Sequence, residues 1–265
     1  MTTLETLDLS SEQTTKFYTQ LQLDNYSAKT ITIIRDSLNL LTRYLKTRDI
    51  VNYREFLINT YAPSTVNLRV YALNKYLKYL DINYHMKSVP NQRAKTLEKV
   101  ISLRNYEKLR DHFKETNLDM YYALKVLAGT GIRPSELFKL RVSDVKRGYA
   151  DLYSKRNKQR RIYFPKELQK ELLTYKTNGN EMLFTFKMHQ LRYAIRQGAR
   201  LGISRDVLHP YSFRHLFGKT FLKRSKNLTL LADLMGHESL ETTRIYTRLT
   251  REEQQREVNR CVDWF

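Results

Sequence analysis

Two arginines in the second half of the chain are candidates for binding a phosphodiester. Arg133 follows the sequence Gly-Thr-Gly-Ile, and Arg214 is followed at once by His215. Attack on a phosphodiester adds negative charge to its non-bridging oxygens, and two guanidiniums can bind those oxygens bidentately and stabilise that charge. We expect Arg133 to open a helix, where the helix N-terminus also favours anions. Considered alone, such a residue is more often a surface arginine at a helix start.

Tyr246 is the candidate nucleophile. A phenol with a pKa of about 10 is only about one-thousandth ionised at pH 7, and nearby guanidiniums would favour the phenolate. The chain has 19 tyrosines, so a tyrosine taken at random is more often a core or rim residue. A family resemblance, which includes the register to Gly236-His237, singles out Tyr246. A phosphotyrosyl product would store the phosphodiester energy, and religation would then require neither ATP nor a metal.

Other enzymatic chemistries lack their motifs in this sequence. There is no GxxxxGK[ST] motif and no GxGxxG motif after a predicted strand. Acidic residues in the second half are scattered rather than clustered as a two-metal nuclease requires, and the six histidines show no HxxxH or HExxH spacing. The single cysteine, Cys261, excludes a disulfide framework and a multi-cysteine metal site. We therefore expect no metal and no cofactor.

The charge and the glycines divide the chain into two parts. The net charge is +20, which points to a polyanionic partner, most simply nucleic acid. Residues 1–90 carry a net charge of +3 and residues 91–265 carry +17, and all eight glycines lie at or after Gly129. These compositions predict a helical domain at 1–85, a linker at 86–97, and a second domain at 98–265 that ends in a tail at 250–265.

Apolar periodicity predicts a mostly α fold with a small antiparallel β-sheet, in the α+β class. The first domain is predicted to be a small bundle with helices at 11–23, 27–45, 51–60 and 64–80. In the second domain, helices are predicted at 104–116, 118–128, 165–175, 188–201, 211–223, 228–235 and 242–249, and strands at 140–145, 149–153 and 161–164.

Three segments of the second half resemble the three catalytic boxes of the tyrosine site-specific recombinases, which include phage integrases, Xer recombinases and transposon-encoded relatives. The segments are residues 129–137 (GTGIRPSEL), 211–217 (YSFRHLF), and 234–237 (LMGH) followed by Tyr246. They occur in the family's order and spacing, with Lys155 between the first two. The helical first half is similar to the family's core-binding domain.

The resemblance implies a role for each central residue. Tyr246 would be the nucleophile and form a 3′-phosphotyrosine, and Arg133 and Arg214 would bind the scissile phosphate. His237 would hydrogen-bond a non-bridging oxygen, and His215 would orient or buttress the site. An acidic residue at the position of Glu136 supports the active site in the family, although a glutamate there also satisfies a helix dipole.

A basic hairpin is expected to supply the general acid. In the family, a lysine on this hairpin protonates the departing 5′-hydroxyl, and the resemblance places it at Lys155, although Ser154 and Arg156 stand where the family has glycines. Lys158 is the alternative. Basic side chains of this hairpin also suit plain phosphate contacts, a role open to Lys158, Arg160 and Arg161.

The second box departs from the family pattern at its first residue. The family usually has a histidine three residues before the arginine, where this chain has Tyr211. A phenol can donate a hydrogen bond in its place, but it does not act as an acid and base at neutral pH as imidazole does. His209 is a less favoured substitute, because Pro210 intervenes.

The resemblance also implies a clamp of the two domains around double-stranded DNA with inverted-repeat sites. Lys187, Arg192 and Arg196 lie on or beside one predicted helix and are candidate DNA contacts, although a solvated basic face explains them equally well. The apolar end of the tail would dock on its own domain or pack onto a neighbouring protomer, which would join four protomers in a ring. The sequence does not identify an accessory protein.

These features predict a site-specific DNA recombinase of integrase or transposase type. Two alternatives remain: a type IB topoisomerase-like enzyme, and a DNA-binding protein whose catalysis has decayed at Tyr211. The N-terminal sequence MTTLETLDLSSEQ is too acidic and polar for a signal peptide, and the apolar runs are too short to span a bilayer. We therefore expect a cytoplasmic protein with no membrane segment.

Overall fold

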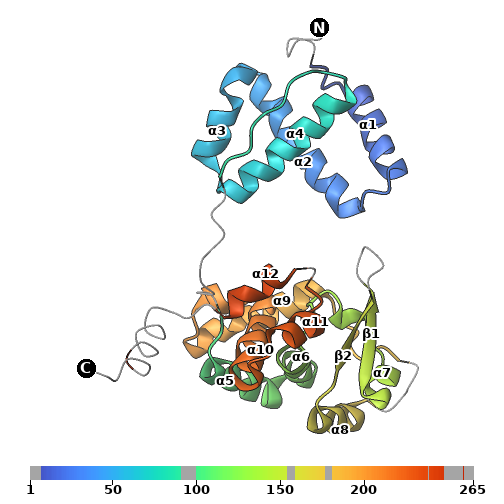
Figure 1. The fold of residues 1–265 in the computed structure, drawn as a ribbon, viewed down its shortest axis with the longest axis vertical. Coiled ribbons are helices and arrows are strands. Elements are labelled where there is room, and N and C mark those ends of the chain that lie inside the picture. Colours follow the sequence, from blue (N-terminus) through green and yellow to red (C-terminus); the bar gives the residue numbers. More distant parts are fainter. Residues whose placement is uncertain are drawn as a thin grey trace. The chain divides into compact units, whose positions relative to one another are not determined.

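The computed structural model describes residues 7–90, 100–153, 159–176, 181–237, 239–247 and 259. The chain forms two compact units, Met1–Arg93 and Ala94–Phe265, which are described in turn (Figure 1). Both units are built mainly from helices, and the described strands form one two-stranded antiparallel sheet, as the sequence predicts. No described helix is long and apolar enough to cross a membrane.

Within residues 7–90, the first unit forms a bundle of four α-helices. They are α1 (Ser11–Leu23), α2 (Ala28–Leu45), α3 (Tyr53–Thr60) and α4 (Pro63–Tyr79), and the 3₁₀ turn η2 (Ile50–Asn52) precedes α3. Ser10 and Ser27 cap α1 and α2 with side-chain oxygens that accept backbone N–H bonds left without partners at a helix start. The four predicted helices are confirmed with shifts of a few residues at their ends.

The chain stays packed on the first unit beyond residue 85, where the predicted domain ends. The side-chain amide of Asn74 on α4 donates to Met86 O and accepts from Met86 N, both at 2.9 Å. Asn67 holds Val89 in the same way, at 2.9 and 2.8 Å. Because an amide side chain both donates and accepts, each asparagine satisfies the backbone N–H and C=O of one residue, as a neighbouring β-strand would. Residues 86–90 therefore belong to the first unit.

The second unit is organised around α6 (Leu118–Thr130), whose apolar residues are buried on most sides. Helix α10 (Pro210–Ser225) packs along α6, and α5 (Leu103–Thr116) and α8 (Lys166–Tyr175) pack against other parts of it. The elements of this unit are α5 (Leu103–Thr116), α6 (Leu118–Thr130), η3 (Leu137–Lys139), α7 (Val142–Arg147), β1 (Tyr149–Tyr153), β2 (Gln159–Tyr163), α8 (Lys166–Tyr175), α9 (Met188–Gln197), η4 (Gly198–Leu201), η5 (Arg205–Val207), α10 (Pro210–Ser225), α11 (Leu228–Met235), α12 (Leu240–Thr243) and η6 (Arg244–Tyr246).

A small second cluster of buried side chains lies apart from this core. It consists of Leu231 and Met235 of α11 and Tyr246 of η6, with Phe217 and Phe221 of α10 partly buried against them. The C-terminal elements α11, α12 and η6 are thus attached to α10 through a cluster of their own.

Two local predictions for the second unit are wrong. Residues 140–145 form no strand: α7 begins at Val142, and Asp144 accepts the backbone N–H of Arg141 to close the first turn at 2.8 Å. The apolar residues Val142 and Val145 are three apart and therefore share a helix face. Arg133 does not open a helix either, because α6 continues to Thr130 and Arg133 lies in the turn that precedes η3.

Candidate active site

Arg214 is a buried arginine that joins the ends of two helices. It lies on α10, is 4% exposed, and donates from Nη1 to Gly131 O and from Nη2 to Met235 O, the latter at 2.5 Å. Gly131 ends α6 with a φ of +63°, in the left-handed region that favours glycine. Carbonyls at helix C-termini carry partial negative charge, so they hold the guanidinium in place.

Arg133 lies beside this arrangement and donates to the carbonyl next to Met235 O. Its Nη2 donates to Gly236 O at 2.6 Å, and its Nη1 donates to Glu136 Oε1 at 3.1 Å. Glu136 is buried and also accepts the backbone N–H of Arg133 at 3.0 Å. Gly236 ends α11 with a φ of +61°. The two predicted phosphate-binding arginines are therefore fixed to adjacent carbonyls, Met235 O and Gly236 O.

Arg160 is a third guanidinium of the same cluster. It lies on β2, donates from Nη1 to Leu234 O at 2.7 Å, and forms an ion pair with Glu136. Its neighbour Arg161 points to the other face of the strand, where it pairs with Asp151 at 2.9 Å and stacks on Tyr149. The strand therefore directs one arginine of the predicted DNA contacts into the site and the next one outward.

Tyr246 and His215 are joined by a hydrogen bond. The Tyr246 hydroxyl lies 2.9 Å from His215 Nδ1, and Tyr246 is 7% exposed. Burial raises the pKa of Tyr246 to about 12, although the charge of Arg214 opposes this shift. Gly218 makes room for the phenol ring, because a Cβ atom at that position would lie 2.6 Å from Tyr246 Cε1.

His237 connects the arginines to the segment that carries the tyrosine. Its Nε2 lies 3.3 Å from Arg214 Nη2, and its Nδ1 lies 2.7 Å from the hydroxyl of Thr243. Burial, with the nearby charges of Arg214 and Arg133, lowers the pKa of His237 to about 4. Burial also lowers the pKa of His215 to about 4, helped by His209 and Arg214. Both imidazoles are therefore neutral at pH 7.

A cavity of about 500 Å³ opens beside these residues. Arg133, Arg160 and His237 line it, together with Gln159 and Tyr163 of β2. Arg161 also borders the cavity, and three guanidiniums with a neutral imidazole suit an anionic oxygen of a phosphodiester. Among the described residues, no group of three or more histidine, cysteine or acidic side chains could hold a metal ion.

Other predicted site residues lie away from this cluster or outside the described residues. Tyr211 is 48% exposed in the first turn of α10, and within the described part of the chain no hydrogen bond links it to Tyr246 or Arg214. His209 caps α10 with Nδ1, which accepts from Ser212 N at 3.1 Å. Lys155, Lys158 and the tail at 250–265, except residue 259, lie outside the described residues.

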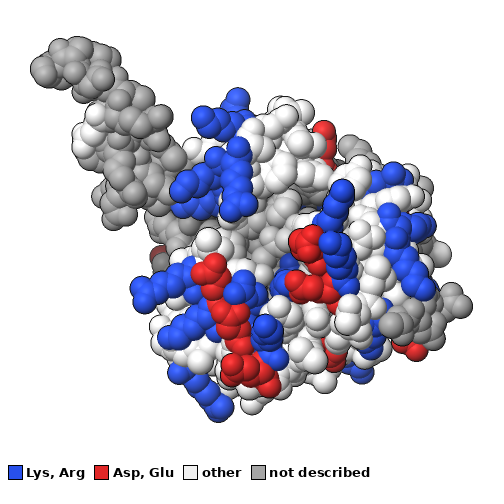
Figure 2. Space-filling model, turned by 90° about the horizontal axis from the view of Figure 1, so that it is seen from below, with Lys and Arg blue, Asp and Glu red and all other residues white. Residues whose placement is uncertain are grey.

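The predicted DNA contacts on α9 are exposed. Arg192 and Arg196 are four residues apart and lie on one face of the helix, and Lys187 precedes its first turn. Figure 2 shows basic side chains gathered in several groups over one face of the molecule, with acidic side chains among them. Exposure leaves the α9 residues available to a phosphate backbone.

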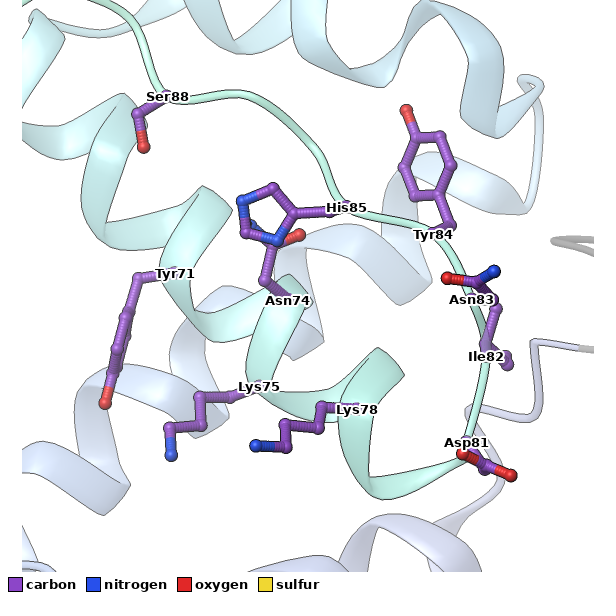
Figure 3. Close-up of a pocket in the computed structure, with 10 residues that line it drawn as sticks. All are labelled: Tyr71, Asn74, Lys75, Lys78, Asp81, Ile82, Asn83, Tyr84, His85 and Ser88. Carbon is purple, nitrogen blue, oxygen red and sulfur yellow. The ribbon is translucent and has the colours of Figure 1, made fainter.

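A larger cavity in the first unit lacks the features of an active site. It has a volume of about 620 Å³ and lies between α4 and the segment that follows it. In Figure 3, Lys75 and Lys78 lie side by side on α4, and His85 lies next to Asn74. Among the described residues that line it, no tyrosine hydroxyl is hydrogen-bonded to a histidine, as Tyr246 is to His215. The candidate catalytic chemistry therefore belongs to the second unit.

Three features of the site were not expected from the sequence. Thr243 is fully buried and bonds to His237, Gly218 makes room for the tyrosine, and Arg160 is buried rather than exposed. Strand alternation is a signal that could have revealed the last of these. Residues two apart on a strand share a face, and Arg160 precedes the core residue Ile162 by two.

Comparison with known proteins identifies close parallels. Residues 99–253 match the model of the phage integrase family. The chain is 28% identical to the tyrosine recombinase XerA of Pyrococcus furiosus over 277 residues, which cover 96% of this chain and 95% of that protein. The fold is similar to XerH bound to palindromic difH substrate, with a TM-score of 0.72, 21% identity, and coverage of 97% and 85%. It is also similar to a lambda integrase tetramer bound to a Holliday junction, with a TM-score of 0.71, 15% identity, and coverage of 91% and 78%.

Proposed function

Because this chain belongs to the phage integrase family, we propose that it is a site-specific DNA recombinase that cleaves and rejoins strands through a covalent 3′-phosphotyrosine. One observation carries the proposal. Arg133, Arg214 and His237 come from distant parts of the sequence. In the structure the two arginines donate to the adjacent carbonyls of Gly236 and Met235, His237 lies against Arg214, and Tyr246 is buried nearby. This arrangement supplies both charge stabilisation and a nucleophile for phosphodiester chemistry.

In the proposed reaction, the Tyr246 oxygen attacks the scissile phosphorus and the bond to the 5′-oxygen breaks. Arg133 and Arg214 stabilise the added charge on the non-bridging oxygens, and His237 donates a hydrogen bond to one of them once Nε2 carries a proton. Lys155 is proposed to protonate the departing 5′-oxygen. A 5′-hydroxyl from another strand then attacks the phosphotyrosine, which restores a phosphodiester and releases the tyrosine without ATP.

The two alternatives receive less support. A type IB topoisomerase-like enzyme would use related chemistry, but the relative that matches nearly the whole chain is a tyrosine recombinase. A protein that binds DNA without cleaving it would not need a buried tyrosine held against an imidazole, and Tyr246 and His215 are so placed. Recombination therefore accounts for the site and the comparisons together.

The partners are proposed to be double-stranded DNA and further copies of this chain. The XerH complex contains a palindromic substrate, and the lambda integrase complex is a tetramer on a Holliday junction. By extension, we propose that this protein acts on inverted repeats as a homotetramer, with the tail at 250–265 contacting a neighbouring protomer. The first unit would act as the core-binding domain, and the cytoplasm is the proposed compartment.

The proposal is tested with a nicked suicide duplex that traps the covalent intermediate. The candidate sites to be tested are inverted repeats sought in the DNA on either side of the gene for this chain. A protein–DNA adduct on a denaturing gel is expected in EDTA as well as in magnesium. Tyr246→Phe should abolish the adduct, whereas Tyr122→Phe, on α6 outside the site, should keep it. Absence of an adduct with every candidate site would contradict the proposal, and relaxation of plasmid lacking any site would favour the topoisomerase.

A further inference from the structure

We propose that His215 accepts the proton of Tyr246 during cleavage and returns it during religation, which supplies the acid and base function that Tyr211 lacks. This inference rests on the proposed recombinase function and assigns one step of its chemistry to a specific atom, His215 Nδ1. The sequence suggested only that His215 orients or buttresses the site.

The geometry places His215 in direct contact with the reacting atom. Its Nδ1 lies 2.9 Å from the Tyr246 hydroxyl, and the two ring centroids are 5.8 Å apart at an angle of 44°. Gly218, three residues further along α10, lies under the phenol ring and lets it approach the helix. Among the described residues, the partner of the Tyr246 hydroxyl is His215 Nδ1.

The other candidate acceptors are engaged or lie elsewhere. Both ring nitrogens of His237 already have neighbours within hydrogen-bond distance. Its Nε2 lies near Arg214 Nη2, and its Nδ1 lies near the Thr243 hydroxyl. His209 uses Nδ1 to accept from Ser212 N at the start of α10. Tyr211 is half-exposed and has no such contact with Tyr246 among the described residues. His215 is thus the imidazole whose position matches the role.

The protonation states suit transfer during attack rather than before it. Burial, His209 and Arg214 hold the pKa of His215 at about 4, so the imidazole is neutral at pH 7 and has one ring nitrogen without a proton. In the tautomer that carries its proton on Nε2, Nδ1 can accept the proton of Tyr246. Burial keeps Tyr246 protonated in the free protein, with a pKa of about 12. The transition state places additional negative charge on the phosphate oxygens, and that charge stabilises an imidazolium formed nearby. Transfer is therefore coupled to formation of the new bond.

The step is balanced in protons and bonds. As the Tyr246 oxygen bonds to phosphorus, its proton moves to His215 Nδ1, and the bond between phosphorus and the 5′-oxygen breaks. The leaving oxygen takes a different proton, which the proposed function assigns to Lys155. On religation the incoming 5′-hydroxyl returns its proton to the neutral amine that cleavage leaves at Lys155, and the departing Tyr246 oxygen recovers its own from His215.

The decisive experiment combines His215→Asn with a nucleophile that needs no base. Asparagine keeps a hydrogen-bonding group near the position of Nδ1 but does not accept a proton at neutral pH. Single-turnover cleavage of the suicide duplex is expected to fall by about 100-fold. Replacing Tyr246 by trifluorotyrosine, whose fluorines lower the phenol pKa, should restore most of that loss in the His215→Asn protein. A merely structural role would leave the loss unchanged by fluorination.

Controls separate this proposal from the proposed function. His112→Asn on α5 should cleave at the native rate. If native protein forms the adduct and His215→Asn cleaves within about threefold of it, recombinase function stands and the role of His215 is wrong. If trifluorotyrosine does not restore the cleavage rate that His215→Asn loses, the proposed role of His215 is likewise wrong. If native protein forms no adduct while Tyr246 is intact, both fail together.

A second measurement uses the native side chain at position 215, in case His215→Asn does not fold. A duplex with a bridging sulfur in place of the 5′-oxygen has a leaving group that needs no proton. With this substrate, slower cleavage in D₂O reports the proton of the nucleophile alone. We expect at least a twofold slowing with tyrosine and none with trifluorotyrosine at position 246. Equal rates in H₂O and D₂O with tyrosine would overturn the proposal.

Discussion

Glu136 and Arg160 form a buried ion pair that connects the turn after α6 to strand β2. Their side chains are 9% and 8% exposed, and Arg160 donates from Nη2 to Glu136 Oε2. The same carboxylate also binds Arg133 through its backbone N–H and its guanidinium. One acidic side chain therefore orients two arginines, and without that carboxylate both would lose their acidic partner.

Glu136→Ala should lower the free energy of unfolding by about 3–5 kcal/mol, because removing one partner leaves buried charges without compensation. Urea denaturation measures this change. The matched control is Glu167→Ala on α8, whose partner Lys170 is 73% exposed and whose ion pair is solvated. The control should keep the native midpoint. Equal midpoints for the two variants would show that the buried pair contributes little.

Gly236→Ala should impair both stability and cleavage. Its left-handed backbone costs an L-residue roughly 1–2 kcal/mol, and the added Cβ would overlap with Arg160 Cδ. Gly202→Ala provides the control, because Gly202 has a φ of +75° but no atom near its Cβ position. Both variants should lose stability in urea, and only Gly236→Ala should also cleave the suicide duplex more slowly. Native cleavage by Gly236→Ala would contradict the assigned position of Arg160.

Arg214→Lys should reduce single-turnover cleavage by about 10²–10³-fold, the usual effect of removing one preorganised donor from a developing negative charge. A single ammonium does not reproduce the two-pronged contact with Gly131 O and Met235 O. Gel-shift affinity for the duplex should change much less than the rate. Arg110→Lys on α5 is the control, and it should retain native cleavage. A comparable loss of affinity and rate for Arg214→Lys would indicate a binding role instead.

The free energy of unfolding should fall as the pH is lowered from about 6.5 towards 4. The folded-state pKa values of His215 and His237 are about 4, below the ordinary 6.5, so the unfolded chain binds more protons across this interval. Stability is therefore greatest above the unfolded pKa and decreases on acidification. Urea denaturation at pH 7 and pH 5 measures the fall. His215→Asn should show a smaller fall than native protein, and an identical fall would contradict the buried neutral state of His215.

Removing Arg192 and Arg196 together should weaken DNA binding and reduce its dependence on salt. If each contacts one phosphate, the slope of log K against log salt should decrease by about 0.9 per residue. Filter binding over a range of salt concentrations measures the slope. Lys166→Ala with Lys170→Ala on α8 has the same spacing and should leave the slope unchanged. An unchanged slope for the α9 pair would mean that its basic face is merely solvated.

Most of the elements that position the site were accessible to the sequence. Helix α11 and strand β1 begin and end where periodicity predicts, because their apolar residues fit one period and turn or cap residues stand at their ends. The arginines, His237 and Tyr246 were predicted from the resemblance of three segments to the family's catalytic boxes, and the structure brings them together. The prediction at residues 140–145 failed because a short apolar run fits a helix and a strand equally well.

The contacts between distant elements were not accessible in the same way. Arg160 reads as one of several basic residues on a hairpin, and its buried position follows only from how β2 packs against α11. The bond between His215 and Tyr246 depends on the path of η6 past α10, across residues 31 positions apart in the chain. Local secondary-structure propensity does not predict such a long-range contact, since the contact arises from tertiary packing.

The separate packing of Leu231, Met235 and Tyr246 has a consequence for how the tyrosine is controlled. Segments held by small clusters open at lower free energy than the main core, and they do so as units. The nucleophile is therefore coupled to the docking of α11 and η6 on α10, and the end of α11 also carries the carbonyls that accept from Arg214 and Arg133. In hydrogen-exchange terms, this predicts that amides of α11 and η6 exchange together and faster than those of α6. Because Met235 O and Gly236 O accept from Arg214 and Arg133, the same opening would also release contacts of both arginines, so the nucleophile and its phosphate-binding site would be assembled or taken apart together.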